Sequence, residues 1–368
     1  MKNSLGISKE PSKTRVVVAM SGGVDSSVVA AMLNKEGYEV IGITLQLYSS
    51  NDSFQKHKKT CCAGQDVLDA KRVADTIGIK HYVFDYEKIF KERVIDKFVS
   101  SYQKGETPIP CINCNQEVKF QDLLNTARSL DADVMATGHY IRRVSSQNKN
   151  TLYKAKDLSR DQSYFLFNIT SDQLEFLRFP LGDLQKTEVR ALAAEFGLLV
   201  AEKPDSQDIC FVPDGKYAKV IEKIDKKKQI PGDIVDLEGN VLGEHLGIIN
   251  FTVGQRRGIK IGNSFPYYVL KIDALNNRII VGKKESLLVN TVNLTDVNWI
   301  ESQKDDNLDL EVKLRSTQEA VRANLKKINR KWLVTLDKSE SGVSPGQACV
   351  FYKGEMLIGG GWVIGANY

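Results

Sequence analysis

The sequence predicts an α/β fold: a doubly wound parallel sheet, followed by a small central domain and a C-terminal β-barrel. Apolar runs alternate with helical patterns over the first third of the chain, which is typical of consecutive βαβ units. A glycine-rich turn joins the first of these runs to the first helical pattern. Beyond about Pro231 the texture changes to short β-rich runs separated by Gly, Asn and Asp, which favours a small barrel.

Four apolar runs in the first third are predicted to be buried parallel strands. They are Val16 to Met20, Val40 to Leu47, His81 to Asp85 and Asp133 to Thr137. The segments between them have the apolar spacing of helices: Val28 to Glu36, Gln65 to Ile77 and Phe120 to Leu130. Such a sheet binds ligands at the carboxyl ends of its strands. We expect the lysine-rich stretch Asn51 to Lys59 to be a mobile loop over that edge.

The length of 368 residues exceeds the usual single core of about 250 to 300 residues, so two or three domains are expected. We predict a nucleotide-binding domain over residues 1–170, a central helical domain over 171–230 and the barrel over 231–368. Helices are expected at Ser171 to Leu177 and Thr187 to Phe196. The predicted C-terminal strands are Ile248 to Val253, Tyr267 to Ile272, Arg278 to Val281, Glu311 to Leu314, Lys331 to Leu336 and Ala348 to Tyr352.

The composition, with 42% hydrophobic and 26% charged residues, is ordinary for a soluble protein. No apolar run approaches the roughly 20 residues of a membrane helix, and the polar start has no signal-peptide core. We therefore expect a cytoplasmic protein that is not in a membrane. The net charge of +5 permits nucleic-acid binding but is too small to predict it alone.

The glycine-rich turn spans Ser21 to Ser27 and opens a helix. Gly22 and Gly23 allow close approach of a phosphate to backbone N–H groups at a helix N-terminus, and the serine hydroxyls can add hydrogen bonds. Asp25 suits a magnesium ion held on the phosphates. The turn is not a Walker A loop, because no Gly-Lys-Ser/Thr ends it. The competing interpretation is a plain helix cap in a Ser/Gly turn.

Six cysteines without a secretory signal argue for catalysis or metal binding rather than a disulfide framework. In the segment Thr107 to Asn115, Cys111 and Cys114 form a C-x-x-C before a helix, so at least one thiol is expected near a helix N-terminus with a lowered pKa. A zinc ribbon would need a second C-x-x-C, which is absent. Cys210, alone, fits a core residue as well as a nucleophile. Three others are interpreted as structural or incidental: Cys61, Cys62 and Cys349.

The glycine-rich turn resembles the pyrophosphate-binding loop of the N-type ATP pyrophosphatases. With further motifs in order, the chain closely resembles the tRNA-specific 2-thiouridylases from about Arg15 to Trp362. These motifs are Thr107 to Phe120, Ala136 to Tyr140, Lys156 to Phe165, Asp205 to Phe211, Gly254 to Gly258 and Pro345 to Gln347.

The resemblance implies an adenine nucleotide alpha hydrolase-like domain and an enzyme that replaces the 2-oxygen of the wobble uridine in tRNA with sulfur. ATP with Mg²⁺ adenylates the uridine O2 and releases pyrophosphate, and AMP then leaves as sulfur enters. By the same resemblance, Cys210 carries a persulfide received from a donor protein, such as a sulfur relay protein or a cysteine desulfurase. Cys114 is the second thiol, which forms a disulfide with Cys210 or attacks as a nucleophile.

The resemblance also implies binding residues, with Asp25 a catalytic residue. ATP contacts fall on Ala19, Met20, Ser21, Gly22, Gly23, Val24, Asp25, Ser26, Leu45 and Gly138. The target base is expected near Ile109, Pro110 and Cys111. The residues expected to face tRNA are His139, Arg160, Asp161, Gln162, Arg315 and Gln347.

One position departs from the family: Cys111 stands where much of the family has Asp. Cys111, Cys114 and Cys210 could therefore hold an iron–sulfur cluster with one iron open to sulfide, which is the alternative to the persulfide route. Rival functions are a small-molecule synthetase, a nucleotide-sensing module, and a sibling enzyme acting on cytidine or another tRNA position. The tRNA species, the sulfur donor and the oligomeric state cannot be predicted from the sequence.

Overall fold

The computed structural model describes residues 2–48, 62–146, 149–205, 209–212, 215–225, 228–262, 266–329 and 331–367. The predicted loop Asn51 to Lys59 and Cys61 lie outside these ranges. Contacts divide the chain into two compact units. The first unit comprises Met1–Val94, Cys111–Pro213 and Glu355–Leu357, and the second comprises Ile95–Pro110, Asp214–Gly354 and Ile358–Tyr368. The three predicted domain boundaries stay a prediction.

The first unit is built on the predicted parallel sheet, with strand order β3-β2-β1-β4-β7. The order reverses between β1 and β4, which makes this pair the topological switch point. In the register of the sheet, Val17 of β1 is paired with Ile41 of β2 on one side and with Met135 of β4 on the other. The strands are β1 (Arg15–Ala19), β2 (Glu39–Gln46), β3 (Lys80–Asp85), β4 (Val134–Thr137) and β7 (Leu177–Arg178).

Burial of the third strand was wrongly predicted. In β3, Tyr82 is 44% exposed and Val83 is 41% exposed. The reason is that β3 is the edge strand of the sheet and has a neighbour on one side only. Alternation of apolar residues within the sequence does not reveal which strand will lie at an edge.

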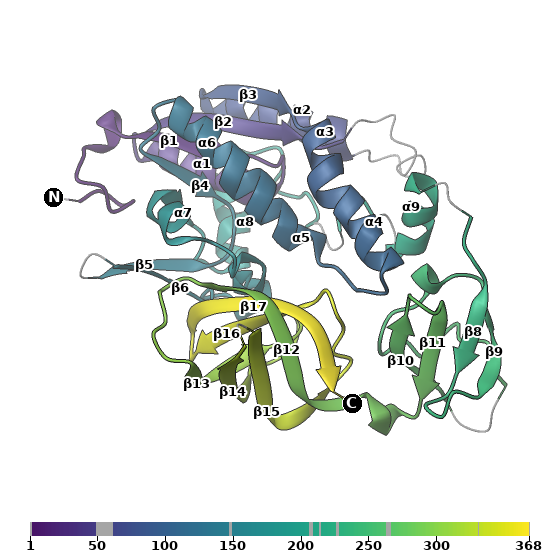
Figure 1. Cartoon of the computed structure of the whole chain (residues 1–368). Helices are drawn as coiled ribbons and strands as arrows, with labels where there is room; N and C mark the ends of the chain where they lie inside the picture. Colours follow the sequence, from purple (N-terminus) through teal and green to yellow (C-terminus); the bar gives the residue numbers. More distant parts are fainter. Residues whose placement is uncertain are drawn as a thin grey trace. The chain divides into compact units, whose positions relative to one another are not determined.

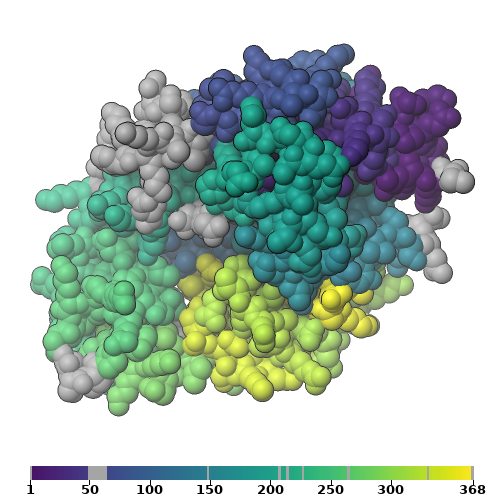
Figure 2. All heavy atoms as spheres, turned by 180° about the vertical axis from the view of Figure 1, so that it is seen from behind, coloured from purple at the N-terminus to yellow at the C-terminus, as the bar shows by residue number. Residues whose placement is uncertain are grey.

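Helices cover both faces of this sheet (Figure 1). On one face lie α1 (Val24–Lys35) and α2 (Cys62–Ile77), with α8 (Lys186–Glu195) packed against α1. Figure 2 shows the teal residues that include α8 beside the purple N-terminal segment. Buried residues such as Val28 and Leu33 form the core under these helices.

On the opposite face the structure differs from the predicted α-helix Phe120 to Leu130. The helical segment starts earlier, as α5 (Pro110–Asn113), and continues as a π-helix, η3 (Cys114–Leu123), before α6 (Leu124–Ser129). A π-helix is rare and is found mostly at functional sites. A period of about 3.6 residues between apolar positions predicts an α-helix and cannot distinguish it from the wider turn of a π-helix.

Shorter elements complete the first unit, including a hairpin of β5 and β6 in which Arg142 lies opposite Tyr153. Glu355–Leu357 belong to this unit because Met356 pairs with Tyr153. The bounds are η1 (Pro11–Lys13), α3 (Glu87–Phe90), η2 (Lys91–Ile95), β5 (Arg142–Ser146), β6 (Lys149–Tyr153), η4 (Leu158–Arg160), η5 (Ser163–Leu166) and α7 (Ser171–Phe176).

The second unit contains a four-stranded sheet of order β10-β11-β8-β9. The predicted strand Ile248 to Val253 is wrong: it begins as a 3₁₀ turn, η7 (Ile248–Asn250), after Gly247 at φ 141°. The amide of Asn250 donates to the carbonyl of Gly247, which closes this turn. The other elements are α4 (Asp96–Gln103), α9 (Tyr217–Ile224), β8 (Gly232–Val235), β9 (Val241–His245), β10 (Tyr268–Asp273), β11 (Arg278–Gly282) and η8 (Lys284–Leu287).

The predicted C-terminal barrel is confirmed. Its strands follow the order β12-β15-β14-β13-β16-β17, and pairing of β12 with β17 closes it. Trp332, Phe351 and Cys349 lie in its core, so Cys349 serves there as a buried apolar residue. The strands are β12 (Leu288–Trp299), β13 (Asn307–Lys313), β14 (Val321–Ile328), β15 (Lys331–Ser341), β16 (Ala348–Lys353) and β17 (Met356–Asn367). Across the described ranges, no helix is both long and apolar enough to cross a membrane.

Candidate active site

The glycine-rich turn lies at the switch point, between the carboxyl end of β1 and the start of α1. Gly22 has φ +74°, and a Cβ there would lie 2.1 Å from the carbonyl oxygen of Asp66 in α2, so only glycine fits. A Cβ on Gly138, which follows β4, would lie 2.8 Å from the amide nitrogen of Ser26. The turn after β1 and the turn after β4 therefore meet at the start of α1.

The hydroxyl groups of Ser26 and Ser27 stabilise this turn by hydrogen bonds to its own backbone. The Ser26 hydroxyl accepts a hydrogen bond from the Ser21 amide (3.1 Å), and the fully buried Ser27 hydroxyl donates to the Gly23 carbonyl (2.8 Å). Ser27 is therefore engaged with the helix rather than turned to a ligand. Binding of an anion falls to the first backbone N–H groups of α1, which have no intrahelical acceptor, and to the helix dipole.

The other predicted ATP residues occupy the same edge of the sheet. Met20 and Val24 are buried on either side of the turn, and the Met20 amide donates to the Ile43 carbonyl of β2. Leu45, near the end of β2, is partly exposed, as are Ala19 and Gly23. These positions bring the strand ends and the turn together without presenting polar side chains of their own.

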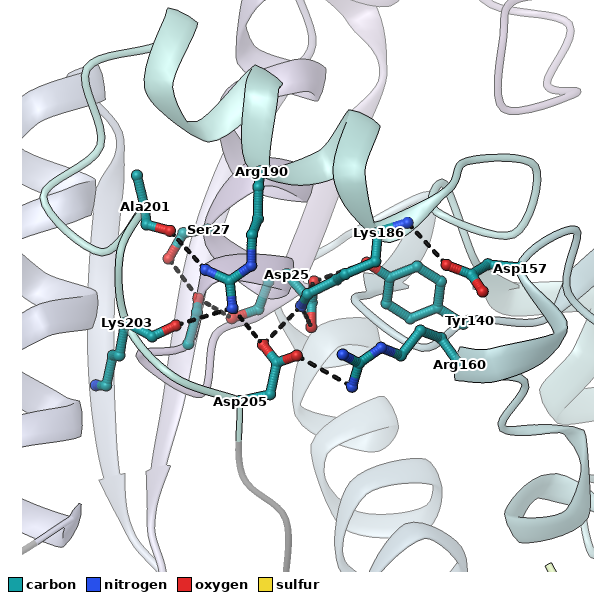
Figure 3. Close-up of polar contacts among 12 residues, drawn as sticks. Asp25, Ser27, Tyr140, Asp157, Arg160, Lys186, Arg190, Ala201, Lys203 and Asp205 are labelled. Carbon is teal, nitrogen blue, oxygen red and sulfur yellow. Dashed lines mark hydrogen bonds and ion pairs between the residues drawn. The ribbon is translucent and has the colours of Figure 1, made fainter. Parts of the chain in front are cut away.

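Asp25, in the first turn of α1, is the centre of a charged network (Figure 3). Its Oδ1 accepts hydrogen bonds from the Tyr140 hydroxyl (2.9 Å) and from Lys186 Nζ (2.7 Å), and its Oδ2 accepts from the same ammonium (2.9 Å). Lys186 is only 8% exposed and also pairs with Asp205 at 2.9 Å. Burial, and then the Asp25 carboxylate, raise the pKa of Tyr140, which keeps its hydroxyl protonated as a donor.

Asp205 connects this network to the segment that leads to Cys210. Its carboxylate pairs with Lys186, with Arg190 (2.9 Å) and with Arg160 (3.1 Å). Burial alone would raise the pKa of Asp205, but the hydrogen bond from Lys186 and the three positive charges hold it below its usual value. The Asp205 carboxylate is therefore ionised, and it shares the Lys186 ammonium with Asp25 (Figure 3).

The three thiols singled out from the sequence lie in the first unit. Besides desolvation, charge on Cys114 and then on Cys111 raises the pKa of Cys210, and charge on Cys114 raises that of Cys111, so the three thiols interact electrostatically. Cys114 is buried, whereas Cys111 and Cys210 are exposed residues. The fold thus brings Cys210 to the C-x-x-C segment.

The predicted lowering of a thiol pKa is wrong. Desolvation by the surrounding protein is the largest effect on Cys111, Cys114 and Cys210, and it raises the pKa of all three. Cys111 and Cys114 lie in the first turns of the continuous helical segment formed by α5, η3 and α6, and the dipole of this segment does not outweigh the desolvation. The thiols are therefore predominantly protonated at neutral pH.

Within the part of the chain that the structure describes, no three His, Cys, Asp or Glu side chains form a group that could hold a metal ion. An iron–sulfur cluster needs convergent thiolates. The alternative in which Cys111, Cys114 and Cys210 hold a cluster therefore stays a prediction.

His139, predicted to face tRNA, follows β4 and is held by neighbouring side chains. Its Nδ1 is 2.9 Å from the Thr137 hydroxyl, and its ring meets the edge of Phe120. Burial, and then the positive charge of Lys119, lower the pKa of His139 to about 3. The imidazole is therefore neutral at physiological pH, so it can donate a hydrogen bond but supplies no charge to a phosphate.

The predicted tRNA residues Arg160 to Gln162 make intramolecular contacts. Arg160 pairs with Asp205, and Asp161 accepts hydrogen bonds from the amide and hydroxyl of Ser163. The Gln162 side chain accepts from the Tyr140 amide (2.8 Å). These residues shape the border of the charged network, and each remains partly exposed.

The other predicted tRNA residues lie in the second unit. Gln347 donates to the Thr107 carbonyl (2.7 Å), and the Thr107 amide donates to the Pro345 carbonyl (2.7 Å). The segment that runs to Ile109 and Pro110 is thus held by the turn before β16. Arg315 donates to the Ser341 carbonyl (2.7 Å) and remains partly exposed.

Comparisons with known proteins agree over the whole chain. Residues 14–214 match the family described as "tRNA methyl transferase HUP domain", and later segments match its PRC-barrel domain (218–283) and an "Aminomethyltransferase beta-barrel domain" (289–363). The tRNA-specific 2-thiouridylase MnmA of Paracoccus denitrificans is 55% identical over 98% of this chain and 94% of that protein. The chain belongs to this family. The corresponding protein of Dinoroseobacter shibae is 56% identical over 98% of this chain and 96% of its own length.

This chain shares only a distant likeness with a solved 4-thiouridine synthetase–RNA complex with bound ATP. That chain is 19% identical to this one, the match covers 57% of this chain and 50% of that one, and the TM-score is 0.34. Likeness at this level carries no argument about activity, so the assignment rests on the family relatives.

Two basic residues of the site, Lys186 and Lys203, were missed by reasoning from the sequence. Lys186 starts α8, and Lys203 donates to the Gly22 carbonyl (2.9 Å) while pairing with Asp66 and Asp69 at 2.7 and 2.6 Å. In the sequence, both look like ordinary surface lysines. The one available signal is that Lys203 directly precedes the motif containing Asp205.

Proposed function

We propose that this protein is an ATP-dependent tRNA sulfurtransferase that converts the 2-oxygen of the wobble uridine to sulfur. The observation that carries the proposal is that one compact unit holds both a pyrophosphate-type turn and a cluster of three thiols. Adenylation explains the turn, and sulfur transfer explains the thiols. Relatives of nearly the same length are named for this reaction.

In the first step, the uridine O2 bonds to the α-phosphorus of ATP while the bond to pyrophosphate breaks. The turn from Ser21 to Ser26 and the α1 dipole would bind the departing pyrophosphate. Lys186 is held at Asp25 by two hydrogen bonds and would supply a fixed positive charge to the phosphates. Mg²⁺, with Asp25 as the residue that would hold it, would further neutralise the phosphates when bound.

In the second step, a persulfide on Cys210 attacks the activated C2, and AMP leaves. The resulting disulfide joins Cys210 Sγ to the sulfur on the base. The Cys114 thiolate then attacks Cys210 Sγ, forming a Cys114–Cys210 disulfide and releasing the thiolated base with the electron pair. A dithiol reductant restores the thiols, and a persulfide donor protein reloads Cys210.

Recognition of tRNA is assigned to residues in both units. The target base, flipped out of its stack, would lie near Ile109, Pro110 and Cys111, because C2 must reach the thiols. His139 would add a neutral donor. Backbone and base contacts are assigned to Arg160, Asp161, Gln162, Arg315 and Gln347. We also propose a cytoplasmic location, and residues 1–170, 171–230 and 231–368 remain our proposed domains.

The test is thiolation of unmodified tRNA by purified protein with ATP and a persulfide donor, run beside pyrophosphate release and an iron and acid-labile sulfide assay on protein purified without oxygen. Thiolation by iron-free protein supports the persulfide route. Activity that requires a stoichiometric cluster would replace it with the cluster on Cys111, Cys114 and Cys210. A small-molecule synthetase would instead keep full activity in Cys210→Ser.

A further inference from the structure

The sulfur-transfer steps leave one charged residue at the thiol cluster without a role. Lys119 lies in the π-helix η3, which begins at Cys114. Its Nζ donates a hydrogen bond to Oδ1 of Asn115 (3.0 Å), the residue next to Cys114. Asn115 is buried and is itself held by a bond from its Nδ2 to the Phe165 carbonyl (3.3 Å).

The π-helix explains why this lysine reaches the thiols. A π-helix bonds residue i to residue i+5, so Lys119 stands one wide turn after Cys114. In an α-helix, with 3.6 residues per turn, a residue five positions on is turned well away from the first. The irregular helix thus places an ammonium group on the same side as the thiol.

The charge of Lys119 acts on every titratable group of the cluster. It lowers the pKa of Cys111, of Cys114 and of Cys210, against the desolvation that raises them. It also lowers the pKa of His139, which follows β4. The charge of one ammonium therefore acts on four titratable groups from three separate segments.

Among the described residues, no ion pair joins this ammonium to a carboxylate. Of the two acids in the same helix, Asp122 is paired with Arg93 at 2.9 Å, and Glu117 has an interaction of its own. The contact with Asn115 is to a neutral amide. The positive charge therefore remains available for the anions that form on sulfur.

We propose that Lys119 is the positioning residue that stabilises the thiolate and persulfide anions of the sulfur relay, an inference that rests on the proposed function. When Cys114 attacks Cys210, negative charge passes from the Cys114 sulfur to the sulfur on the base. In a desolvated cluster of this kind, such charge needs a nearby cation. Asn115 holds the ammonium so that it serves the cluster throughout the transfer.

The experiment compares the wild type with Lys119→Met and Lys119→Arg, and with Lys35→Met as a matched control on α1. The pH midpoint of iodoacetamide alkylation is measured at each cysteine by mass spectrometry, beside pyrophosphate release and single-turnover thiolation. We expect Lys119→Met to raise the midpoints at Cys114 and Cys210 by about one pH unit and to slow thiolation about tenfold. Pyrophosphate release should stay within about twofold, and Lys119→Arg should recover most of the rate.

Unmoved alkylation midpoints in Lys119→Met would overturn the inference, even if thiolation were lost, because a merely structural role would not move them. If Lys119→Met does not fold, Lys119→Gln takes its place, since glutamine is a good helix former with no charge. Failure of the wild type to thiolate tRNA would overturn the proposed function alone, because the midpoints report Lys119 directly.

Discussion

The nucleotide end of the first unit and its thiol cluster have opposite electrostatic designs. At the nucleotide end, Asp25 and Asp205 share the Lys186 ammonium, and Asp205 is ionised. At the cluster, desolvation raises the pKa of Cys114 and Cys210, and one lysine opposes it. The adenylating end thus has its charges arranged in advance, whereas the sulfur end must create its reactive anion.

This difference suits the two chemical steps. The triphosphate of ATP arrives already charged, so fixed donors and cations would bind it without rearrangement. A thiol is reactive only as thiolate, and a raised pKa limits the thiolate that oxidants can attack between turnovers. The comparison predicts that substitutions at one end will leave the step assigned to the other end intact.

The largest effect is expected when Cys114 or Cys210, the two relay cysteines, is replaced, because this should affect sulfur transfer and leave adenylation intact. Cys210→Ser and Cys114→Ser should reduce thiolation by about a thousandfold or more, because a hydroxyl cannot carry the sulfur or form the disulfide. Pyrophosphate release with tRNA should stay within about threefold of the wild type. Cys349→Ser, altered in the barrel core, is the control for a missing thiol. Thiolation that survives in either relay variant would contradict the assigned roles.

The reciprocal variant acts at the nucleotide end. Lys186→Met removes the ammonium between Asp25 and Asp205, leaving two partly buried carboxylates without their shared cation. We expect pyrophosphate release to fall about a hundredfold, while the alkylation midpoints of Cys114 and Cys210 stay unchanged. Circular dichroism controls for folding. A normal rate of pyrophosphate release would remove Lys186 from the adenylation step.

Gly22 tests whether the turn itself is preorganised. In Gly22→Ala, the new Cβ would meet the Asp66 carbonyl at 2.1 Å, and φ +74° would strain any residue with a side chain. The free energy of unfolding should fall by about 2 to 3 kcal/mol, measured by urea denaturation. Gly64→Ala is the matched control, since a Cβ there meets nothing within 4 Å. Equal stability of the two variants would show that α2 can move away from the turn.

Sequence reasoning predicted the parallel sheet, the barrel and the residues at both ends of the site, because strand periodicity and motif order are local properties. It could not anticipate the π-helix, since the apolar residues of Phe120 to Leu130 also fit an α-helix. It also missed Lys186 and Lys119. Each is an ordinary lysine in the sequence, and only the fold brings it to a carboxylate or a thiol.

The direction of the thiol pKa shift was also wrongly predicted because it depends on the whole fold. A C-x-x-C motif before a helix indicates a helix dipole, but the residues next to Cys114 in the sequence do not reveal how deeply the fold buries it. Desolvation, which depends on the whole fold, outweighs the dipole of the helical segment that starts at Pro110. The sequence therefore singled out these thiols but gave the wrong sign for the shift of their pKa.

A smaller difference between the two ends is expected in how the rates of thiolation and of pyrophosphate release depend on pH. Because the pKa values of Cys114 and Cys210 are raised, the thiolate fraction increases with pH throughout the neutral range. Single-turnover thiolation should rise up to about tenfold per unit between pH 7 and 9, while pyrophosphate release changes by less than about twofold. Parallel profiles for both steps would show that thiolate formation does not limit sulfur transfer.

The smallest effect is expected at an ion pair outside both ends. Lys35 pairs with Glu195 at 2.8 Å, joining α1 to α8, but their side chains are 64% and 57% exposed. Water screens such a pair, so Lys35→Met should change the free energy of unfolding by less than about 1 kcal/mol and leave both catalytic steps unchanged. Urea denaturation at low and high salt measures this. A larger loss in the free energy of unfolding, accompanied by slower pyrophosphate release, would show that packing of α8 on α1 controls where Lys186 meets Asp25. The nucleotide end would then depend on an ion pair at the protein surface.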